Sequence, residues 1–514
     1  MDIEVTGALV FRQYYLGCLS QASYLLGDRT TGRAVVVDPQ RDIGEYLADA
    51  DAAGLRIERV IETHVHADFL SGHLELAEAT GAIVSFGAAA QVGFAVEPLA
   101  DGQVLSLGEV EIEVRHTPGH TPESVCLVVR ERAGAPPWGV LTGDTLFIGD
   151  VGRPDLLGAS GWSPDELARA LYHSTRERLL DLPDATRVFP AHGAGSACGK
   201  NLSSETSSTI GEQRRTNYAL APMPEEAFVA AVLDGQSTAP PYFAHASQAN
   251  RAAHPILHED EPVPALAFDD VPAGAVVLDT RDPADFAAGH LARSVNVGLG
   301  GRFAEMTGDV VGADDDIVLL ADAGTEREAR NRLARIGFDR VLGHLDGGVS
   351  AVPTRHLRAA SRLTAARLAD LLDGGRDVQV VDVRGPGEVR VSGTVPGARP
   401  VPLPELTRRL GELDPRAPTV VLCAGGYRSS IAASVLRARG FADVSDLVGG
   451  FGAWQDGRRP VAPPAASGPT GCSMARTART GRPVSRTCRS RGGAGLLLRL
   501  RHDPDVRAGR RPPV

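Results

Sequence analysis

Short apolar runs recur along the first half of the chain, and each is followed by a cluster of polar residues. The runs are RAVVV at 33–37, IERVI at 57–61, EVEIEV at 109–114, VCLVV at 125–129 and GVL at 139–141. Runs of this length between turn and helix signals are typical of strands in an α/β sheet. The polar residues that follow them include His64, His120, Asp144 and His192. Loops at strand ends can aim such side chains at one point, so we expect a shared site.

The last part of the chain contains an internal repeat with an offset of 103 residues. VVLDTRDPADF at 276–286 aligns with VVDVRGPGEV at 380–389, and IVLLADAGTEREARNRLARIGF aligns with VVLCAGGYRSSIAASVLRARGF. Each copy has the pattern strand, loop, strand, tight loop, helix, strand, which predicts a small parallel α/β domain. The repeat therefore predicts two such domains in tandem.

Proline-rich stretches punctuate these units, and the chain of 514 residues is too long for a single core. We predict four parts: an α/β domain at residues 1–245, the two repeat domains at 265–352 and 360–462, and a disordered Arg-rich tail at 463–514. The tail explains an asymmetry of charge. Residues 464–514 hold eleven arginines and two aspartates, a charge of +9. Since the net charge of the whole chain is −11, residues 1–463 carry a charge of −20. An acidic body argues against nucleic acid as the main partner.

The composition indicates a globular protein outside the membrane. The apolar runs are too short to span a bilayer, and the N-terminus MDIEVTGALVFRQ lacks the pattern of a secretory signal, so we expect a cytoplasmic protein. The six cysteines show no CxxC pair and no regular spacing, which excludes a disulfide framework. They are Cys18, Cys126, Cys198, Cys423, Cys472 and Cys488.

Metal-ligand residues are concentrated in four motifs of the first domain. ETHVHADFLSGH at 62–73 is followed by HTPGHTPES at 116–124, TGDTLFIGD at 142–150 and PAHGAGS at 190–196. An HxH pair places two imidazoles near one ion, and imidazole with carboxylate suits zinc, iron or manganese. Four such motifs at successive strand ends predict a metal centre.

The order THxHxD, PGHT, TGD, PAH resembles the metallo-β-lactamase superfamily, whose fold is an αββα sandwich with the metal at the edge of its two sheets. Dinuclear hydrolases of that superfamily, such as hydroxyacylglutathione hydrolase, have HxHxDH, and the final histidine helps to hold a second metal. Here Phe69 stands in that place, and an aromatic ring donates no lone pair to a cation. A mononuclear centre is therefore expected.

The motifs together are similar to bacterial persulfide dioxygenases of this superfamily that are fused to rhodanese domains. This resemblance implies one Fe(II) per chain, with zinc as the alternative, held by His64, His120 and Asp144; His116 is a competing ligand. Two histidines and one carboxylate on one face of an iron leave the other face open for substrate and O2. The remaining motif residues are expected to orient the ligands or the sulfur substrate: His66, Asp68 and His192.

Arg153 lies nine residues after Asp144 and suits the carboxylates of a thiol carrier, so we predict that it binds substrate. A loop-stabilising contact with Asp155 is the alternative. Three other basic residues are candidates for an anion-binding mouth, although a solvated surface is the favoured interpretation for them: Lys200, Arg214 and Arg215.

The loop CAGGYRSS at 423–430 follows an apolar strand and leads into a helix. Converging backbone N–H groups at such a position stabilise a thiolate, which makes Cys423 a candidate nucleophile, with Arg428 beside it. CxxGxRS with the upstream DVR resembles a rhodanese sulfurtransferase, and the predicted substrate-binding residues of this loop are Gly425, Gly426 and Ser429. In the earlier copy Leu320 takes the place of Cys423, so residues 265–352 are expected to form an inactive rhodanese-like domain. GTVPGA replaces the usual GHIPGA, with Thr394 in place of a histidine.

The resemblance implies oxidation of a low-molecular-weight thiol persulfide by O2 to sulfite and thiol, coupled to sulfur transfer from Cys423 and formation of thiosulfate in sulfide detoxification. A homo-oligomer is expected on the same ground. Two alternatives remain open. One is a zinc thioester hydrolase of the glyoxalase II type with a rhodanese appendage, and the other is a non-oxidative sulfur carrier that only binds persulfides.

Overall fold

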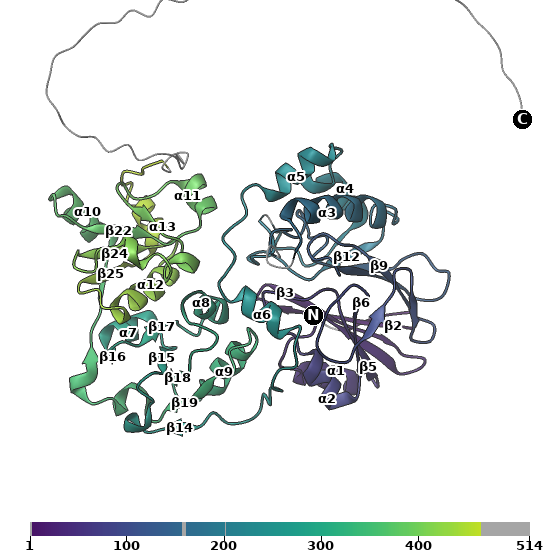
Figure 1. The fold of residues 1–514 in the computed structure, drawn as a ribbon, viewed down its shortest axis with the longest axis horizontal. Coiled ribbons are helices and arrows are strands. Elements are labelled where there is room, and N and C mark those ends of the chain that lie inside the picture. Colours follow the sequence, from purple (N-terminus) through teal and green to yellow (C-terminus); the bar gives the residue numbers. More distant parts are fainter. Residues whose placement is uncertain (1–2, 157–160, 201, 464–514) are drawn as a thin grey trace, which may run out of the picture. The chain divides into compact units, whose positions relative to one another are not determined.

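The computed structural model describes residues 3–156, 161–200 and 202–463, which belong to one compact unit, Met1–Pro464 (Figure 1). Apart from Pro463, the predicted tail at 463–514 lies outside the described residues, and so do Cys472 and Cys488. Within the described ranges, no helix is long and apolar enough to cross a membrane.

The first domain contains two sheets that face each other. Sheet A has seven strands in chain order: β1 (Glu4–Thr6), β2 (Leu9–Leu16), β3 (Gln21–Asp28), β4 (Arg33–Val37), β5 (Arg56–Glu62), β6 (Ile83–Gly87) and β7 (Glu97–Leu99). Sheet B has the order β13 (Ser208–Thr209), β12 (Arg187–Pro190), β11 (Gly139–Gly143), β10 (Val125–Arg130), β9 (Glu111–His116) and β8 (Val104–Ser106). Pairs β4–β5, β5–β6, β6–β7 and β11–β12 are parallel, and the other pairs are antiparallel.

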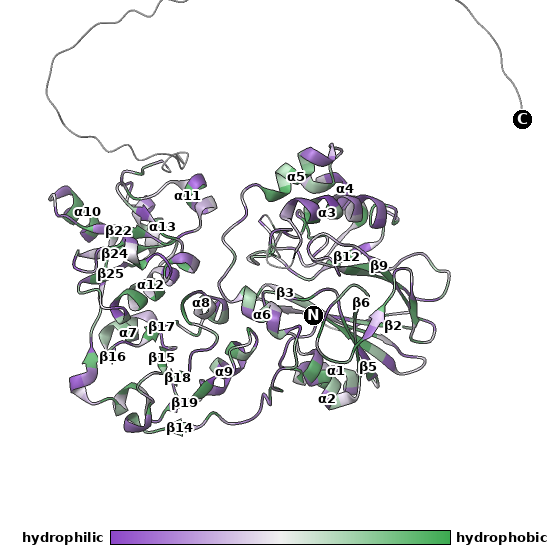
Figure 2. Cartoon of the chain, in the orientation of Figure 1, coloured by the Kyte–Doolittle hydropathy of each residue, from purple (hydrophilic) through white to green (hydrophobic). Residues whose placement is uncertain are grey.

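Helices cover the outer face of each sheet. Those of the first domain are α1 (Gly44–Ala52), α2 (His73–Thr80), α3 (Pro164–Arg178), α4 (Ile210–Thr216), η1 (Tyr218–Leu220), α5 (Glu225–Leu233) and α6 (Phe243–Ala249). Sequence signals explain α3, which begins with a Ser163–Glu166 capping box and a proline and ends with arginines in its last turn. Its outer side is solvated, and α3 is mainly purple in the hydropathy colours of Figure 2.

Three buried clusters define the layers of this domain. One lies between the two sheets and includes Leu26, Ile61, Leu127 and Phe189. A second packs α1 and α2 on sheet A, and a third packs α3, α4 and α5 on sheet B. The order helix, sheet, sheet, helix confirms the predicted αββα sandwich.

The two repeat domains each contain a five-stranded parallel sheet with the same strand order. Sheet C is β14 (Ala265–Leu266), β19 (Val341–Leu345), β18 (Ile317–Leu320), β15 (Val276–Asp279) and β17 (Val295–Asn296). Sheet E is β21 (Ser361–Leu363), β25 (Val444–Leu447), β24 (Thr419–Leu422), β22 (Gln379–Asp382) and β23 (Arg399–Pro400). The register of each pair is parallel, so the predicted pair of parallel α/β domains is confirmed.

Short helices and a two-stranded antiparallel sheet complete the two domains. The middle domain has η2 (Phe268–Asp270), α7 (Pro283–Ala288), α8 (Phe303–Val310), α9 (Glu326–Ala334), η3 (Gly348–Ala351) and η4 (Thr354–His356), with the pair β16 (His290–Leu291) and β20 (Leu357–Arg358). The last domain has α10 (Ala365–Asp373), α11 (Pro386–Ser392), η5 (Leu403–Glu405), η6 (Leu410–Glu412), α12 (Tyr427–Ala438) and α13 (Gly450–Asp456).

One buried cluster runs through all three domains. It begins with Phe69 and Cys198 in the first domain, continues through Tyr242 and through Phe303 of α8, and reaches Cys423 in the last domain. We call it the shared core. Apolar side chains of the middle domain therefore bury surface of both neighbours.

Candidate metal centre and sulfur-transfer site

Loops at the ends of four strands bring the predicted ligands together. His64 follows β5, His120 lies between β9 and β10, Asp144 follows β11 and His192 follows β12. Their side chains are at most 2% exposed. Positions far apart in the sequence thus share one buried site.

His64, His120 and Asp144 form a group whose ligand atoms all lie within 4.8 Å of one another. Asp144 Oδ2 lies 3.9 Å from His64 Nε2 and 3.4 Å from His120 Nε2. The competing candidate, His116, is not in this group, and its Nε2 lies 2.9 Å from Pro122 O.

Each of these three residues also forms a hydrogen bond through its other side-chain nitrogen or oxygen, the one that does not face the group. His64 Nδ1 lies 3.0 Å from Thr63 Oγ1, and His120 Nδ1 lies 2.8 Å from Arg153 O. His192 Nδ1 lies 2.8 Å from Asp144 Oδ1. Contacts of this kind orient the imidazole rings and leave Nε2 of His64 and Nε2 of His120 facing Asp144.

The ligand atoms fit a cation. His64 Nε2 and Asp144 Oδ2 are buried and have no hydrogen-bond partner among the described residues. Burial, aided by positive charge on His66, holds the pKa of His64 well below its ordinary value, so Nε2 keeps its lone pair. Burial opposes ionisation of Asp144, but the nearby histidines outweigh it and hold its pKa low. Two imidazoles and a carboxylate match the donor set of zinc or iron.

His66 faces away from this group, toward two other carboxylates. Its Nε2 lies 3.1 Å from Asp38 Oδ1 and 3.2 Å from Glu62 Oε2. Burial alone would lower the pKa of His66, but Asp38 and Glu62 raise it to about 10. Asp38 also accepts hydrogen bonds from the backbone N–H and the hydroxyl of Thr63, at 2.7 and 2.8 Å. His66 therefore acts on His64 through Asp38 and Thr63.

Asp68 and His192 lie on the other side of Asp144. His192 Nε2 lies 2.7 Å from Asp68 Oδ2, so both ring nitrogens of His192 face carboxylates. Burial disfavours a charged imidazole, but Asp144 and Asp68 raise the pKa of His192 well above its ordinary value. The ring of Phe69 packs against His66, with 4.3 Å between the ring centroids. His192 thus lies between the carboxylates of Asp144 and Asp68, and Phe69 supplies no further imidazole to this group.

Sequence reasoning missed several residues that support this site. Asp38 has a left-handed backbone (φ 50°), which a non-glycine residue rarely adopts outside special sites. Asn250 holds the loop after His66, because its amide donates to His66 O and Phe69 O and accepts from Ser71 N. The sequence separation of Asn250 from that loop gave no signal for this contact.

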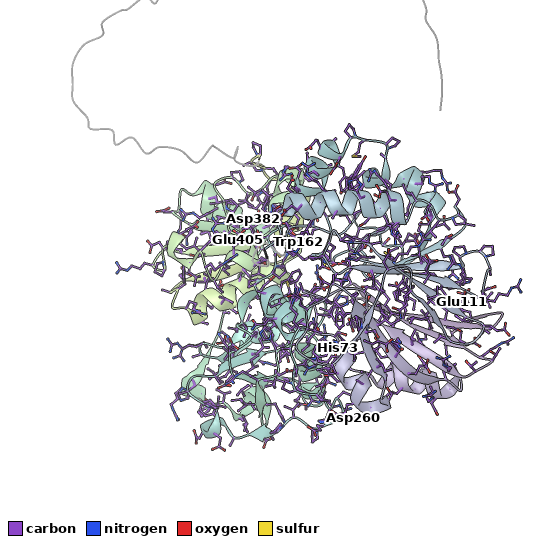
Figure 3. All side chains as sticks on the ribbon, turned by 45° about the vertical axis from the view of Figure 1, so that its right-hand side comes forward. His73, Glu111, Trp162, Asp260, Asp382 and Glu405 are labelled. Atoms are coloured by element: carbon purple, nitrogen blue, oxygen red, sulfur yellow. The ribbon has the colours of Figure 1, made fainter. Side chains whose placement is uncertain are left out.

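Cys198 and Glu62 were also missed. Cys198 lies within 4.8 Å of the ligand atoms of Asp68 and His192, and its position six residues after His192 in PAHGAGSAC was the available signal. Glu62 contacts both His66 and His73, of which the latter is marked in Figure 3. Burial would raise the pKa of Glu62, but these two histidines lower it to about 2.

Arg153 is 2% exposed and its guanidinium is engaged by the protein itself. It pairs with Asp155 through two hydrogen bonds of 2.6 and 2.8 Å and also donates to Ala197 O and Ser237 O. These contacts match the loop-stabilising alternative, whereas the binding of a substrate carboxylate by Arg153 stays a prediction.

The three basic residues that were candidates for an anion-binding mouth differ in their surroundings. Arg214 pairs with Asp184 and Arg215 with Glu212, both on the surface. Lys200 instead directs its ammonium at the carbonyl oxygens of Ala231 and Asp234.

Cys423 lies directly after β24, and the loop that follows it turns back over its sulfur. Gly426 N donates to Cys423 Sγ at 3.1 Å, and Ser429 Oγ lies 3.5 Å from the same sulfur. Gly426 has φ 104° and Gly425 has no atoms near its missing side chain. The Gly426 N–H therefore points at the sulfur and stabilises negative charge on it, whereas the Ser429 hydroxyl accepts from the thiol and donates to Gly426 O.

Arg428 pairs with Glu388 of α11 at 2.6 and 2.7 Å. Thr394, which stands in place of a family histidine, donates to Asp382 Oδ2 at 2.6 Å. Asp382, marked in Figure 3, also pairs with the buried Arg384. The Thr394 hydroxyl thus supplies the Asp382 carboxylate with a donor.

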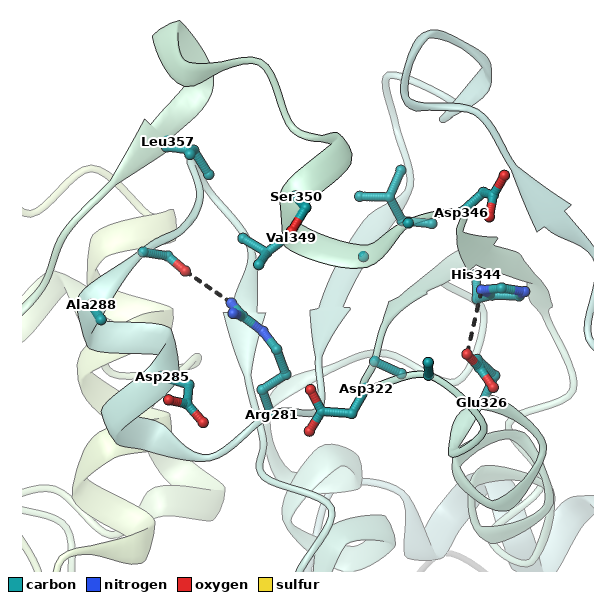
Figure 4. Close-up of a pocket in the computed structure, with 16 residues that line it drawn as sticks. Arg281, Asp285, Ala288, Asp322, Glu326, His344, Asp346, Val349, Ser350 and Leu357 are labelled. Carbon is teal, nitrogen blue, oxygen red and sulfur yellow. Dashed lines mark hydrogen bonds and ion pairs between the residues drawn. The ribbon is translucent and has the colours of Figure 1, made fainter.

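In the middle domain, a leucine stands at the position that corresponds to Cys423. Leu320 ends β18 and is fully buried, and the pocket beside it, of about 760 Å³, is shown in Figure 4. Four acids line that pocket: Asp285, Asp322, Glu326 and Asp346. No cysteine is among the residues that line this pocket, and the inactivity of the middle domain stays a prediction.

Comparison with known proteins agrees with this architecture. Residues 16–192 match the model of the metallo-beta-lactamase superfamily, and residues 267–353 and 364–457 match that of the rhodanese-like domain. An uncharacterized protein of Mycobacterium leprae is 37% identical over 227 residues, which are 39% of this chain and 94% of that protein. Persulfide dioxygenase ETHE1, mitochondrial, from Homo sapiens is 31% identical over 222 residues, 42% of this chain and 78% of the relative. A crystal structure of a metallo-beta-lactamase from Staphylococcus aureus has a TM-score of 0.62 at 32% identity and covers 66% of this chain and 99% of its own.

Proposed function

Since this chain belongs to the metallo-β-lactamase superfamily and carries two rhodanese-like domains behind that sandwich, we propose that it is an iron-dependent persulfide dioxygenase coupled to a sulfurtransferase. The rhodanese-like domains, together with the human relative named persulfide dioxygenase, support an enzyme of sulfur metabolism. The reaction proposed for the first domain is RSSH + O2 + H2O → RSH + SO3²⁻ + 2 H⁺, where RSSH is a low-molecular-weight thiol persulfide. Cytoplasmic placement and a homo-oligomer stay predictions from the sequence.

The observation that carries this proposal is the buried group of His64, His120 and Asp144 with its unpartnered ligand atoms. These three residues would hold one iron(II), and Phe69 takes the place of a further histidine. When bound, the iron supplies coordination of the persulfide sulfur and activation of O2.

Hydrogen bonds within the protein hold the proposed ligand side chains in place before substrate binds. Thr63 and the carbonyl of Arg153 fix the ring orientations of His64 and His120, so that little reorganisation is needed when the metal binds. His192 holds one oxygen of Asp144 and leaves the other for the metal. The buried surroundings exclude bulk water, which strengthens the interactions of these charges.

Sulfur transfer is proposed for Cys423. A sulfane sulfur held as Cys423–S–S⁻ would pass to sulfite, so that the S–S bond breaks, thiosulfate leaves and the Cys423 thiolate is restored. Gly426 N and Ser429 would stabilise the charge on sulfur at both stages. Gly425 and Arg428 are the other residues of this loop that we propose to contact the substrate.

The test is anaerobic purification of the full chain with metal analysis, followed by O2 uptake on glutathione persulfide. The proposal expects about one iron per chain and consumption of O2 that Asp144→Ala abolishes. Zinc-dependent hydrolysis of S-lactoylglutathione without O2 uptake would support the glyoxalase II alternative. Sulfur delivery that survives Asp144→Ala, with no O2 uptake by the unaltered protein, would support the non-oxidative carrier.

A specific contact argues against a second metal of the hydrolase kind. The group of Asp68, His192 and Cys198 offers three ligand atoms, but His192 already faces a carboxylate with each ring nitrogen. A ring nitrogen that donates to a carboxylate has no lone pair for a metal. The unaltered protein is therefore expected to bind one ion.

A further inference from the structure

A cavity of about 850 Å³ lies beside the Cys423 loop, and two domains form its walls. Ala424, Arg390 and Glu388 line it from the last domain, and Lys200 and residues 234–237 line it from the first. Its volume falls within the range of about 300–1,000 Å³ typical of small-molecule sites. Sulfite has only four heavy atoms, so a larger molecule is needed to fill this space.

The first-domain wall of the cavity is tied to the metal centre by Arg153. Its guanidinium donates to Ala197 O at 3.1 Å and to Ser237 O at 2.8 Å, so it holds both segments that reach the cavity. The carbonyl of the same residue lies 2.8 Å from His120 Nδ1. Arg153 is therefore a positioning residue for the wall.

This wall lies close to the last domain. Gly235 is near Arg390, since a Cβ atom built on Gly235 would lie 3.9 Å from Arg390 Nη1. Thr238 donates to Glu405 Oε1 at 2.6 Å, immediately beyond the wall segment. Residues of the first domain thus lie next to the last domain at this wall of the cavity.

The charges around the cavity match a zwitterionic ligand with carboxylates. The guanidinium of Arg390 has no polar partner among the described residues, and the Lys200 ammonium contacts two carbonyl oxygens and the Tyr218 ring but pairs with no described carboxylate. Within the same described part, the carboxylate of Asp234 pairs with no cation, and Gln236 Oε1 is buried without a hydrogen-bond partner. Two cations that lack a carboxylate partner suit the carboxylates of a ligand, while Asp234 and Gln236 suit an ammonium or amide group.

We propose that this two-domain cavity binds a carboxylate-bearing low-molecular-weight thiol and its persulfide as the sulfur partner of Cys423. The inference rests on the sulfur-transfer activity proposed above and names its substrate class. The Cys423 thiolate attacks the outer sulfur of RSSH, the S–S bond of RSSH breaks, and RS⁻ leaves and takes up a proton. The product is the Cys423 persulfide, and no external oxidant or reductant is needed.

The middle domain provides a comparison within the same chain. With the offset of 103 residues, Arg281, Asp285 and Ala321 of its pocket correspond to Arg384, Glu388 and Ala424 (Figure 4). All residues that line this pocket come from the middle domain itself, and its acids repel carboxylates. The copy without a nucleophile has also lost the features that would select the thiol.

Binding is tested with S-methylglutathione, which has both carboxylates and cannot react, by calorimetry on the full chain. The unaltered protein should bind it, and Arg390→Gln should weaken binding about tenfold because a charge-assisted hydrogen bond is lost. Ser237→Trp, which fills the cavity from the first domain, should weaken it by at least as much. The matched controls Arg376→Gln and Ala230→Trp alter exposed residues that do not line the cavity and should bind normally.

Sulfur transfer from thiosulfate provides the second measurement. Ser237→Trp should raise KM for glutathione as acceptor more than KM for cyanide, because cyanide is small and needs little of the cavity. The inference is overturned if the unaltered protein fails to bind S-methylglutathione, or if Ser237→Trp binds it normally. If binding follows the expected pattern but no sulfur reaches cyanide, the cavity is supported and the proposed transfer activity is overturned instead.

Discussion

Replacement of Phe69 by histidine tests how this chain limits its metal content. Phe69 is 1% exposed, belongs to the shared core and directly follows Asp68 in the chain, so Phe69→His restores the imidazole found at this position in HxHxDH hydrolases. We expect the metal content to rise from about one to about two ions per chain. Elemental analysis after equilibration with excess metal measures this change.

The magnitude of the effect on stability follows from the burial of Phe69. The lost packing costs about 1–2 kcal/mol, which Phe69→Leu measures alone. A buried imidazole without a partner adds about 1–3 kcal/mol, so the metal-free Phe69→His protein is expected to lose roughly 2–5 kcal/mol. A second metal at about 100 times its Kd returns about 2.7 kcal/mol. Calorimetric unfolding with and without metal should therefore show a larger rise in Tm for Phe69→His than for Phe69→Leu. Two ions already bound to the unaltered protein, or an equal rise for both variants, would refute the reasoning.

Three other expectations concern separate parts of the molecule. Asn250→Ala removes three hydrogen bonds to the loop after His66 and should cost about 2–3 kcal/mol in calorimetric unfolding, with weaker metal binding; Asn250→Asp, which keeps the acceptor, should lose less. Cys423→Ser should abolish sulfur transfer in a cyanide assay and leave O2 uptake intact, and a loss of both would contradict separate sites. Burial would raise the pKa of Glu388, but Arg428 outweighs it and lowers the pKa below the ordinary 4.5. The stabilisation from this pair is therefore present above pH 4.5 and lost as pH falls through the lower folded value; Glu388→Gln should flatten that loss in acid unfolding, and an unchanged profile would show that the pair contributes nothing.

The sequence predicted the fold because its signals are local or repeated. The offset of 103 residues carried β15 onto β22 and β18 onto β24, and the strand orders of sheets C and E agree with it. The metal ligands were recognisable because each follows an apolar run at the end of a strand. Cys423 was recognisable because its loop glycines and the following helix are adjacent in the chain.

Contacts between distant segments were beyond this reasoning. Asn250 lies 184 residues from His66, whose carbonyl it binds, and nothing in the local pattern of either segment indicates that contact. The environment of Arg153 was equally hidden, since Ala197 and Ser237 reach it only after the first domain has folded. The cavity beside Cys423 depends on two domains meeting, which no motif within one of them describes.

The shared core couples the unfolding of the three domains. Phe69, Tyr242, Phe303 and Cys423 belong to one buried cluster, so loss of any one domain would expose apolar surface of the others. Residues 3–463 are thus expected to melt in one cooperative transition in calorimetry, with calorimetric and van't Hoff enthalpies that agree. A middle domain without a nucleophile would then persist because its neighbours need it to remain folded.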